Sequence, residues 1–107
     1  GTTGCTIDVA AASVHILTLS SGTVISSFTY NNRKASPSVD TLLVVLKFAG
    51  SATITWSNVV WASGITPTLT GANGKADAYM LTSYKGGAAT PVWIGTVVSQ
   101  NLDSTNL

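Results

Sequence analysis

Short runs of alternating apolar and polar residues, separated by glycine, serine and asparagine turns, most constrain what this chain can fold into. Residues 14–19 and 76–82 alternate with a period of two, which is typical of half-buried strands. β-Branched and aromatic residues dominate these runs, whereas Glu is absent and Gln is rare, so helix-favouring stretches are weak. The pattern therefore predicts an all-β fold.

The predicted strands are short and lie at nearly regular spacing. They cover residues 5–9, 14–19, 23–30, 41–48, 52–56, 59–61, 68–70, 75–84 and 91–99. Residues 42–46 are apolar on both sides, which indicates a central strand buried on both faces. Asn73 and Gly74 predict a tight reversal with a positive φ at Gly74. Many short strands parted by such turns predict an antiparallel β-sandwich of eight or nine strands.

The length and the charge content bound the kind of protein. The 107 residues predict a single β-sandwich domain over residues 1–107, with residues 101–107 as a frayed polar tail. Charged residues make up only 8%, where about 25% is typical. Such a surface fits a subunit whose faces are covered by partners, because a free monomer usually needs charge for solubility. An ordinary extracellular β domain remains the alternative.

Several classes of partner and site are disfavoured. A net charge of +1 gives no electrostatic footprint for nucleic acid, and no apolar run is long enough to cross a membrane. Cys5 is the single cysteine, which excludes an internal disulfide and a cysteine-built metal site. We expect no metal and no cofactor. Residues 1–4 lack a signal-peptide pattern, and a start other than Met indicates a processed chain or a fragment.

Candidate catalytic residues are few. His15 is the only histidine, with Asp8 and Ser13 nearby in the sequence, but no Gly-x-Ser-x-Gly motif accompanies it. A position on a sheet face is the favoured interpretation of His15. Asp77 follows a turn, and a turn-stabilising or edge role is favoured over membership of a catalytic carboxylate pair. We therefore expect no enzymatic activity.

The aromatic residues are divided between packing and recognition. Trp56, Trp61 and Trp93 favour a core or a subunit interface over ligand stacking, and we expect at least one of Trp56 and Trp61 to be mostly buried. Four neighbouring residues in a predicted loop are better candidates for exposed recognition contacts: Tyr30, Asn31, Asn32 and Arg33.

The second half of the chain resembles a recurrent domain of tailed-phage virion proteins. The matching motifs are, in chain order, Ile54-Thr55-Trp56, Trp61, Gly64, Pro67-Thr68-Leu69-Thr70, Gly74-Lys75-Ala76-Asp77-Ala78-Tyr79, Gly86-Gly87 and Trp93-Ile94-Gly95. The first half is similar only in its strand pattern. The chain departs from the family pattern in having no Pro after Trp56 and in an insert at residues 88–91.

The resemblance implies a function in virion architecture. It implies a structural protein of the virion exterior, on the tail or the capsid, most closely a tail fibre or receptor-binding appendage that mediates assembly and host attachment. The implied partners are other virion proteins, two further copies in a homotrimer, and a glycan of the host surface. Two alternatives stay open: a capsid decoration or head-fibre protein, and, from another class, a fragment of a polysaccharide-cleaving enzyme.

Overall fold

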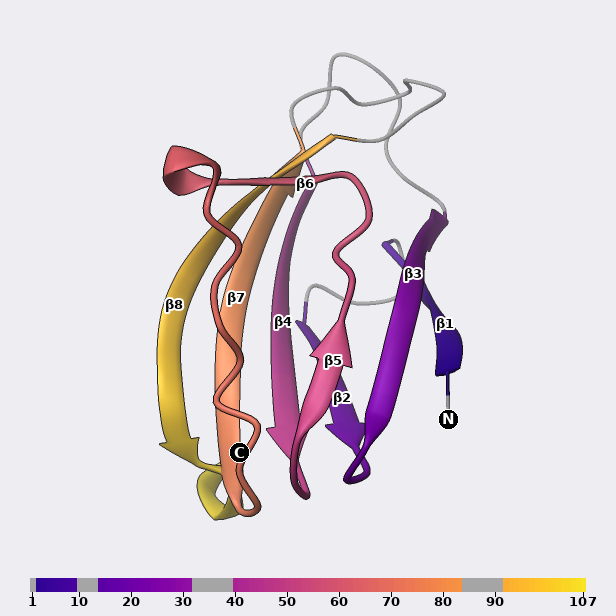
Figure 1. Ribbon diagram of the computed structural model, residues 1–107. Coiled ribbons are helices and arrows are strands. Elements are labelled where there is room, and N and C mark those ends of the chain that lie inside the picture. The colour runs from indigo at the N-terminus through magenta and orange to yellow at the C-terminus, as the bar shows by residue number, and fades with distance from the viewer. Residues whose placement is uncertain (1, 10–13, 32–39, 84–91) are drawn as a thin grey trace.

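The computed structural model describes residues 2–9, 14–31, 40–83 and 92–107 (Figure 1). The elements are β1 (Thr2–Asp8), β2 (Val14–Leu19), β3 (Thr23–Asn31), β4 (Asp40–Phe48), β5 (Ala52–Ile54), β6 (Val59–Trp61), η1 (Ala62–Gly64), β7 (Lys75–Ser83), β8 (Trp93–Asp103) and η2 (Ser104–Asn106). Both η elements are single turns of 3-10 helix, and the described residues contain no α-helix. The prediction of an all-β fold is confirmed for this part of the chain.

The strands form two sheets. One has three strands in the order β1-β3-β5, and the other has five in the order β2-β4-β7-β8-β6. The first five strands alternate between the two sheets along the chain, as Figure 1 shows. Strands that follow each other in sequence therefore do not pair with each other in this half of the protein. We call each such strand–turn–strand unit, with its two strands in different sheets, an arch.

The pairing is mixed, and the prediction of antiparallel pairing is wrong for most of it. β1–β3, β2–β4, β3–β5 and β6–β8 are parallel, whereas only β4–β7 and β7–β8 are antiparallel. Turn residues predict that the chain reverses, but they do not say whether the two flanking strands bond to each other. Here the reversals at residues 20–22 and 49–51 lead from one sheet into the other. Each of these strands therefore pairs with the next strand but one in chain order.

These two reversals lie against each other. The Gly22 amide donates to the Ser51 carbonyl at 2.7 Å. A Cβ at Gly50 would lie 2.5 Å from the Ser21 hydroxyl oxygen, so the approach of the two turns requires glycine there. The arches are therefore stacked turn on turn as well as strand on strand.

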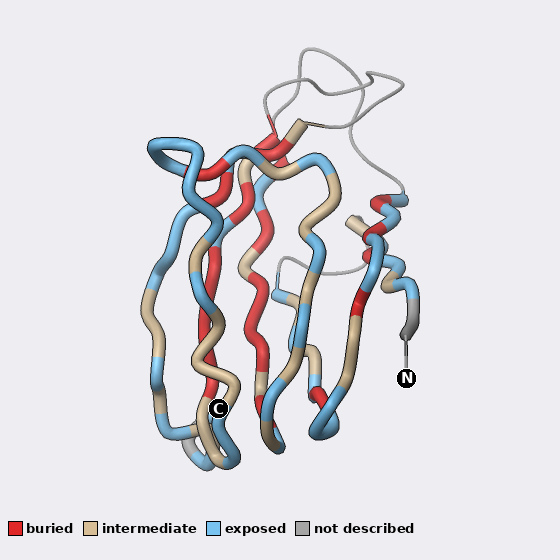
Figure 2. The backbone as a smooth tube through the Cα atoms, in the orientation of Figure 1, coloured by how far each residue is buried: buried red, intermediate tan, exposed pale blue. Residues whose placement is uncertain are grey.

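The hydrophobic core draws on both sheets. Its buried members are Ile7, Leu19, Ile25, Phe28, Tyr30, Leu42, Val44, Leu46, Phe48, Trp61, Tyr79, Leu81 and Trp93. β4 and β7, at the middle of the five-stranded sheet, are its most buried strands (Figure 2). Leu42, Val44 and Leu46 face this core, while Val45 on the other face of β4 is buried in a second, smaller cluster. β4 is thus a central strand buried on both faces, as predicted.

The single cysteine packs at the border of this core. Cys5 is half-buried on β1 and contacts the core cluster. Burial raises the pKa of its thiol, which keeps it in the protonated, weakly reactive form. This position suits a cysteine that packs as a small apolar side chain.

Residues 65–72 form an irregular segment between η1 and β7. The expected strand at 68–70 is absent, because the backbone amide of Thr70 bonds to a side chain instead of to a neighbouring strand. The segment ends in a turn closed by the Lys75 amide on the Ala72 carbonyl at 3.1 Å. Gly74 in this turn has φ +77°, which confirms the predicted positive value.

The end of the chain is structured, and the prediction of a frayed tail at residues 101–107 is wrong. β8 continues to Asp103, and η2 follows it. The Ser104 amide donates to the Gly74 carbonyl at 3.0 Å, and the Lys47 ammonium donates to the Leu107 backbone oxygen at 3.1 Å. These bonds hold the polar C-terminal residues against the turn before β7 and against β4.

Candidate functional site

Tyr30 is buried, so the expectation that it is an exposed recognition contact is wrong. Phe28 and Tyr30 are two residues apart on β3 and therefore point to the same face of the sheet, toward the core. The Tyr30 hydroxyl donates to the Ser57 carbonyl at 3.1 Å, and its ring lies 5.0 Å from that of Trp93. Burial raises the pKa of the hydroxyl well above its usual value. Tyr30 is a packing residue.

Asn31 is exposed at the end of β3. Its backbone carbonyl accepts a hydrogen bond from the Val9 amide at 2.9 Å, and its side chain lies on the surface. Asn32 and Arg33 lie outside the described residues. The structure therefore describes two of the four predicted contacts, and of these two Asn31 is the exposed one.

The most elaborate polar arrangement in the described residues surrounds Asp77, which is fully buried. Its carboxylate accepts hydrogen bonds from the Thr70 amide at 2.8 Å, the Tyr79 hydroxyl at 2.9 Å, the Asn101 amide at 3.0 Å and the Thr70 hydroxyl. A carboxylate offers about four acceptor positions, so these donors saturate it. Asp77 lies on β7, between β4 and β8, and the predicted edge role is wrong.

Local backbone geometry explains why these donors converge. Asp77 and Tyr79 are two residues apart on one strand and share its inner face. The pairing of β7 with β8 shifts register next to Asp77, and Asn101 has φ +58°. Such an irregularity re-aims backbone groups, and here it turns the Asn101 amide toward the carboxylate. The third donor residue, Thr70, comes from the irregular segment.

Gln100 extends this arrangement toward the surface. Its side-chain amide donates to the Thr68 carbonyl at 2.7 Å and to the Tyr79 hydroxyl at 3.0 Å. Burial raises the pKa of the Tyr79 hydroxyl, so it remains a proton donor to Asp77. We name Thr68, Thr70, Asp77, Tyr79, Gln100 and Asn101 the Asp77 cluster. Because its acceptors are occupied from within the chain, the cluster fastens segment 65–72 to β7 and β8.

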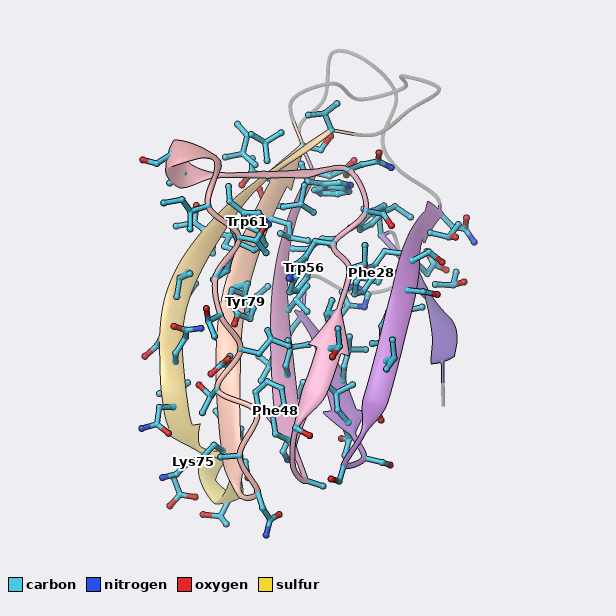
Figure 3. The ribbon with its side chains drawn as sticks, viewed as in Figure 1. Phe28, Phe48, Trp56, Trp61, Lys75 and Tyr79 are labelled. Atoms are coloured by element: carbon cyan, nitrogen blue, oxygen red, sulfur yellow. The ribbon has the colours of Figure 1, made fainter. Side chains whose placement is uncertain are left out.

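An aromatic group packs beside the Asp77 cluster (Figure 3). Trp56 stacks on Phe28 at 5.3 Å and 5° between planes, and meets Trp61 and Tyr79 edge-on at 5.4 Å each. Trp61 is buried and Trp56 is half-buried, which confirms that at least one of the pair is mostly buried. Edge-on and offset contacts of this kind are the favourable geometries for aromatic pairs. These rings hold one another and fill the core.

His15, Asp8 and Ser13 are the residues considered for a catalytic triad. His15 on β2 pairs in register with Val44 of β4 and so shares the inner face of the five-stranded sheet. Asp8 is exposed at the end of β1, and Ser13 lies outside the described residues. Within the described ranges no three metal-ligating residues gather at one place. No helix among the same residues has the length and apolarity to span a membrane.

Two buried polar groups sit at one end of the five-stranded sheet. The Ser83 hydroxyl and the Trp93 indole N–H have no hydrogen-bond partner in the part of the chain that the structure describes. Ser83 and Trp93 face each other in the β7–β8 register, and Asp40 is the β4 partner of Ser83. Buried polar groups nearly always have a hydrogen-bond partner, so each of these two groups can form one further hydrogen bond. Tyr30, which contacts Trp93, brings the end of β3 to the same place.

Sequence reasoning missed the residues of β8 that complete the cluster. Gln100 and Asn101 fell in or beside the expected tail, and no local pattern marks them as partners of Asp77. Gly95 was also missed as a packing residue: a Cβ there would lie 2.6 Å from the Trp61 ring. The Trp-x-Gly motif at residues 93–95 was the available signal, because a glycine two residues after an inward tryptophan sits on the same inward face.

No protein-family model, no curated protein and no solved structure matches this chain. The residues and their arrangement are therefore the basis for a function.

Proposed function

We propose that this chain is a structural domain of a tailed-phage virion, from a tail fibre or receptor-binding appendage that mediates assembly and host attachment. The resemblance over residues 54–95 supports the family and the location. The composition supports a covered subunit, because charged residues make up only 8% of the chain.

One observation carries the proposal: the motif residues hold one another. Thr70, Asp77 and Tyr79 of the motif are joined through one saturated carboxylate, and Trp56 and Trp61 of the motif pack on the Tyr79 ring. Residues assembled for chemistry keep an acceptor, a donor or an open face for a substrate. Residues that satisfy one another support a role in maintaining shape.

The finer parts of the proposal concern arrangement and partners. The two sheets contribute to one core cluster, which supports their packing as a β-sandwich. We propose a homotrimer on the virion exterior, with other virion proteins as neighbours. A host-surface glycan is the proposed ligand of the end where β3 finishes, and exposed Asn31 supports that position.

The location is tested on intact particles. Gold-labelled antibodies against the purified chain are expected to mark the tail fibres or the tail tip in electron micrographs. A matched control uses the same antibodies after absorption with the purified chain. Labelling over the head would favour the capsid-decoration alternative, and particles without label would contradict a virion component.

Attachment is tested by competition. The purified chain, added to host cells before the phage, is expected to lower the fraction of phage adsorbed, while the heat-unfolded chain leaves it unchanged. An Asn31→Ala variant is expected to compete less well than the unaltered chain, because Asn31 is the described candidate contact that is exposed. Release of reducing sugars from host polysaccharide by the purified chain would instead favour the enzymatic alternative.

A further inference from the structure

The five-stranded sheet has a second face, opposite the core, on which apolar side chains lie among the uncharged residues Thr18, Thr41, Thr82 and Thr96. Paired residues on neighbouring strands point to the same side, so the register identifies the members of a face. One row joins Val14, Leu43 and Met80 across β2, β4 and β7. Another joins Ile94 of β8 to Val60 of β6. We call the face that carries these rows the outer face.

Large apolar side chains on the outer face are open to solvent. Val14, Ile16, Val60, Met80 and Ile94 are between 39% and 57% exposed. On β7 and β8 the inward-facing neighbours Tyr79, Leu81 and Trp93 are almost fully buried, so the exposure of Met80 and Ile94 belongs to the outer face. Monomeric proteins rarely leave a contiguous apolar patch of this kind uncovered.

Charge on the outer face is confined to one end. Among the described residues of the paired strands, Lys47 is the charged residue whose register places it on this side, opposite Ala76. Its ammonium group bonds to the backbone oxygen of Leu107. Residues next to a symmetry axis meet their own counterparts, so a face without charge there meets its copies without like-charge repulsion. The face is therefore suited to a second copy of this chain.

We propose that the outer face is where copies of this chain associate, three around a threefold axis; the number three rests on the proposed fibre function. Apolar residues of β2, β4, β7 and β8 then face the axis and exclude water from it. The inference assigns the partly buried Leu43 of β4 to the interface, whereas Leu42, Val44 and Leu46 stay in the core of each copy.

The dimensions of the sheet agree with this arrangement. Four strands at about 4.8 Å spacing and about 3.3 Å per residue give a face of roughly 19 by 30 Å, or about 600 Å² before the relief of the side chains is counted. Stable interfaces bury about 800 Å² per partner, so the face is of a comparable size. Three such faces arranged as a triangular prism would each lie about 5–6 Å from the threefold axis. Packed sheets lie ~10 Å apart, so each sheet lies about half that distance from the plane between them.

The test measures mass by light scattering on the purified chain and on three lysine variants. The unaltered chain is expected at three times its 10.9 kDa mass. Met80→Lys and Ile16→Lys place a charge on the outer face at exposed positions and are expected to give monomers. Ile65→Lys is the matched control: Ile65 is 70% exposed but lies on the irregular segment, so this variant is expected to remain a trimer.

Circular dichroism shows whether each variant is folded. The two outer-face substitutions lie on different strands, so if one variant unfolds the other still tests the interface. A monomeric unaltered chain at high concentration would overturn the inference, as would trimers that persist in both folded outer-face variants. A dimer would overturn the threefold arrangement. The virion proposal can fail separately from this inference. In that case particles carry no antibody label, but the purified chain is still a trimer and Met80→Lys still dissociates it.

Discussion

The two halves of this protein bury their core by different means. From β1 to β5 the chain passes back and forth between two sheets, and its strands pair in parallel with strands two positions away. From β6 onward it stays in one sheet, where β7 joins β4 and β8 in antiparallel pairs. The first half depends on stacked glycine turns, and the second half on the buried Asp77 cluster.

The difference shows what an irregular segment requires. In the arches each strand lies against at least one neighbouring strand, so apolar side chains and tight turns suffice. Segment 65–72 forms no strand, and the part-buried Thr70 amide within it needs another acceptor. Asp77 supplies an acceptor for Thr70 and, from the opposite side, for Asn101. A buried carboxylate thus takes the place of a missing strand.

The largest expected effect is that of Asp77→Ala. The change leaves several buried donors without an acceptor, and each unsatisfied buried donor costs about 1–3 kcal/mol of unfolding free energy. Urea unfolding followed by tryptophan fluorescence measures the loss. Asp103→Ala is the control, because Asp103 is exposed and bonds locally to Thr105. Equal stability of the two variants would break the contrast between the halves.

The stacking of the arches is tested by Gly50→Ala. The added Cβ meets Ser21 on the adjacent turn, and overpacking at a close contact costs about 1–3 kcal/mol. Ser21→Gly in the same chain removes the side-chain atoms that clash, so the double variant is expected to recover most of the loss. A double-mutant cycle on thermal unfolding gives the coupling. Independent effects of the two changes would mean that the turns are not in contact.

The two buried tyrosines compare the halves directly. Tyr79→Phe removes a donor to the buried carboxylate and is expected to cost about 1.5–3 kcal/mol, whereas Tyr30→Phe removes a bond to a neutral carbonyl and is expected to cost about 1 kcal/mol. Denaturant titrations near pH 7 of both variants and the parent chain give the difference. A larger loss for Tyr30→Phe would reverse the ranking of the two regions.

The same tyrosines predict an alkaline loss of stability. Burial raises both hydroxyl pKa values, so the folded protein keeps protons that the unfolded chain releases above pH of about 10. The stabilisation is complete below that pH and falls as pH rises above it. Unfolding free energy measured from pH 8 to 11.5 is expected to decline less steeply in either Phe variant. Parallel curves for all three proteins would contradict the burial of these hydroxyls.

The smallest effect is expected at Asp103. Hydrogen bonds from the Thr105 hydroxyl and amide lower the pKa of this exposed carboxyl. The stabilisation that these bonds give the folded protein is therefore present above the usual carboxyl pKa near 4 and is lost as pH falls below it. Asp103→Asn is expected to reduce slightly the stability difference between pH 5 and pH 2. The NMR titration of the Asp103 carboxyl gives the folded pKa directly, and a value at or above 4 would contradict the bonding to Thr105.

Local sequence patterns predicted the positions of single strands more successfully than they predicted which strands pair. The alternation of residues 14–19 and the apolar run of residues 42–46 located β2 and the central β4, because side-chain period is a property of one strand. The choice of sheet is not local: a turn at residues 20–22 has the same composition whether it closes a hairpin or an arch. The antiparallel prediction was wrong for that reason.

The site residues show the same limit. Tyr30 was judged by its polar neighbours in sequence, although its spacing of two from Phe28 pointed to the core. Asp77 was judged by its charge, which usually means the surface. Its burial depends on donors from Thr70 and Asn101, which belong to segments that no single window of sequence contains.

The alternation of the first five strands also sets an order in time. β1 and β2 meet no backbone partner when they are made, because each pairs with a strand that comes later in the chain. Local hairpins can close early, whereas parallel pairs must wait for a longer loop to close. The β7–β8 ladder is therefore expected to form ahead of the arches, and the part of the chain synthesised first is expected to be the last to acquire its protection from hydrogen exchange.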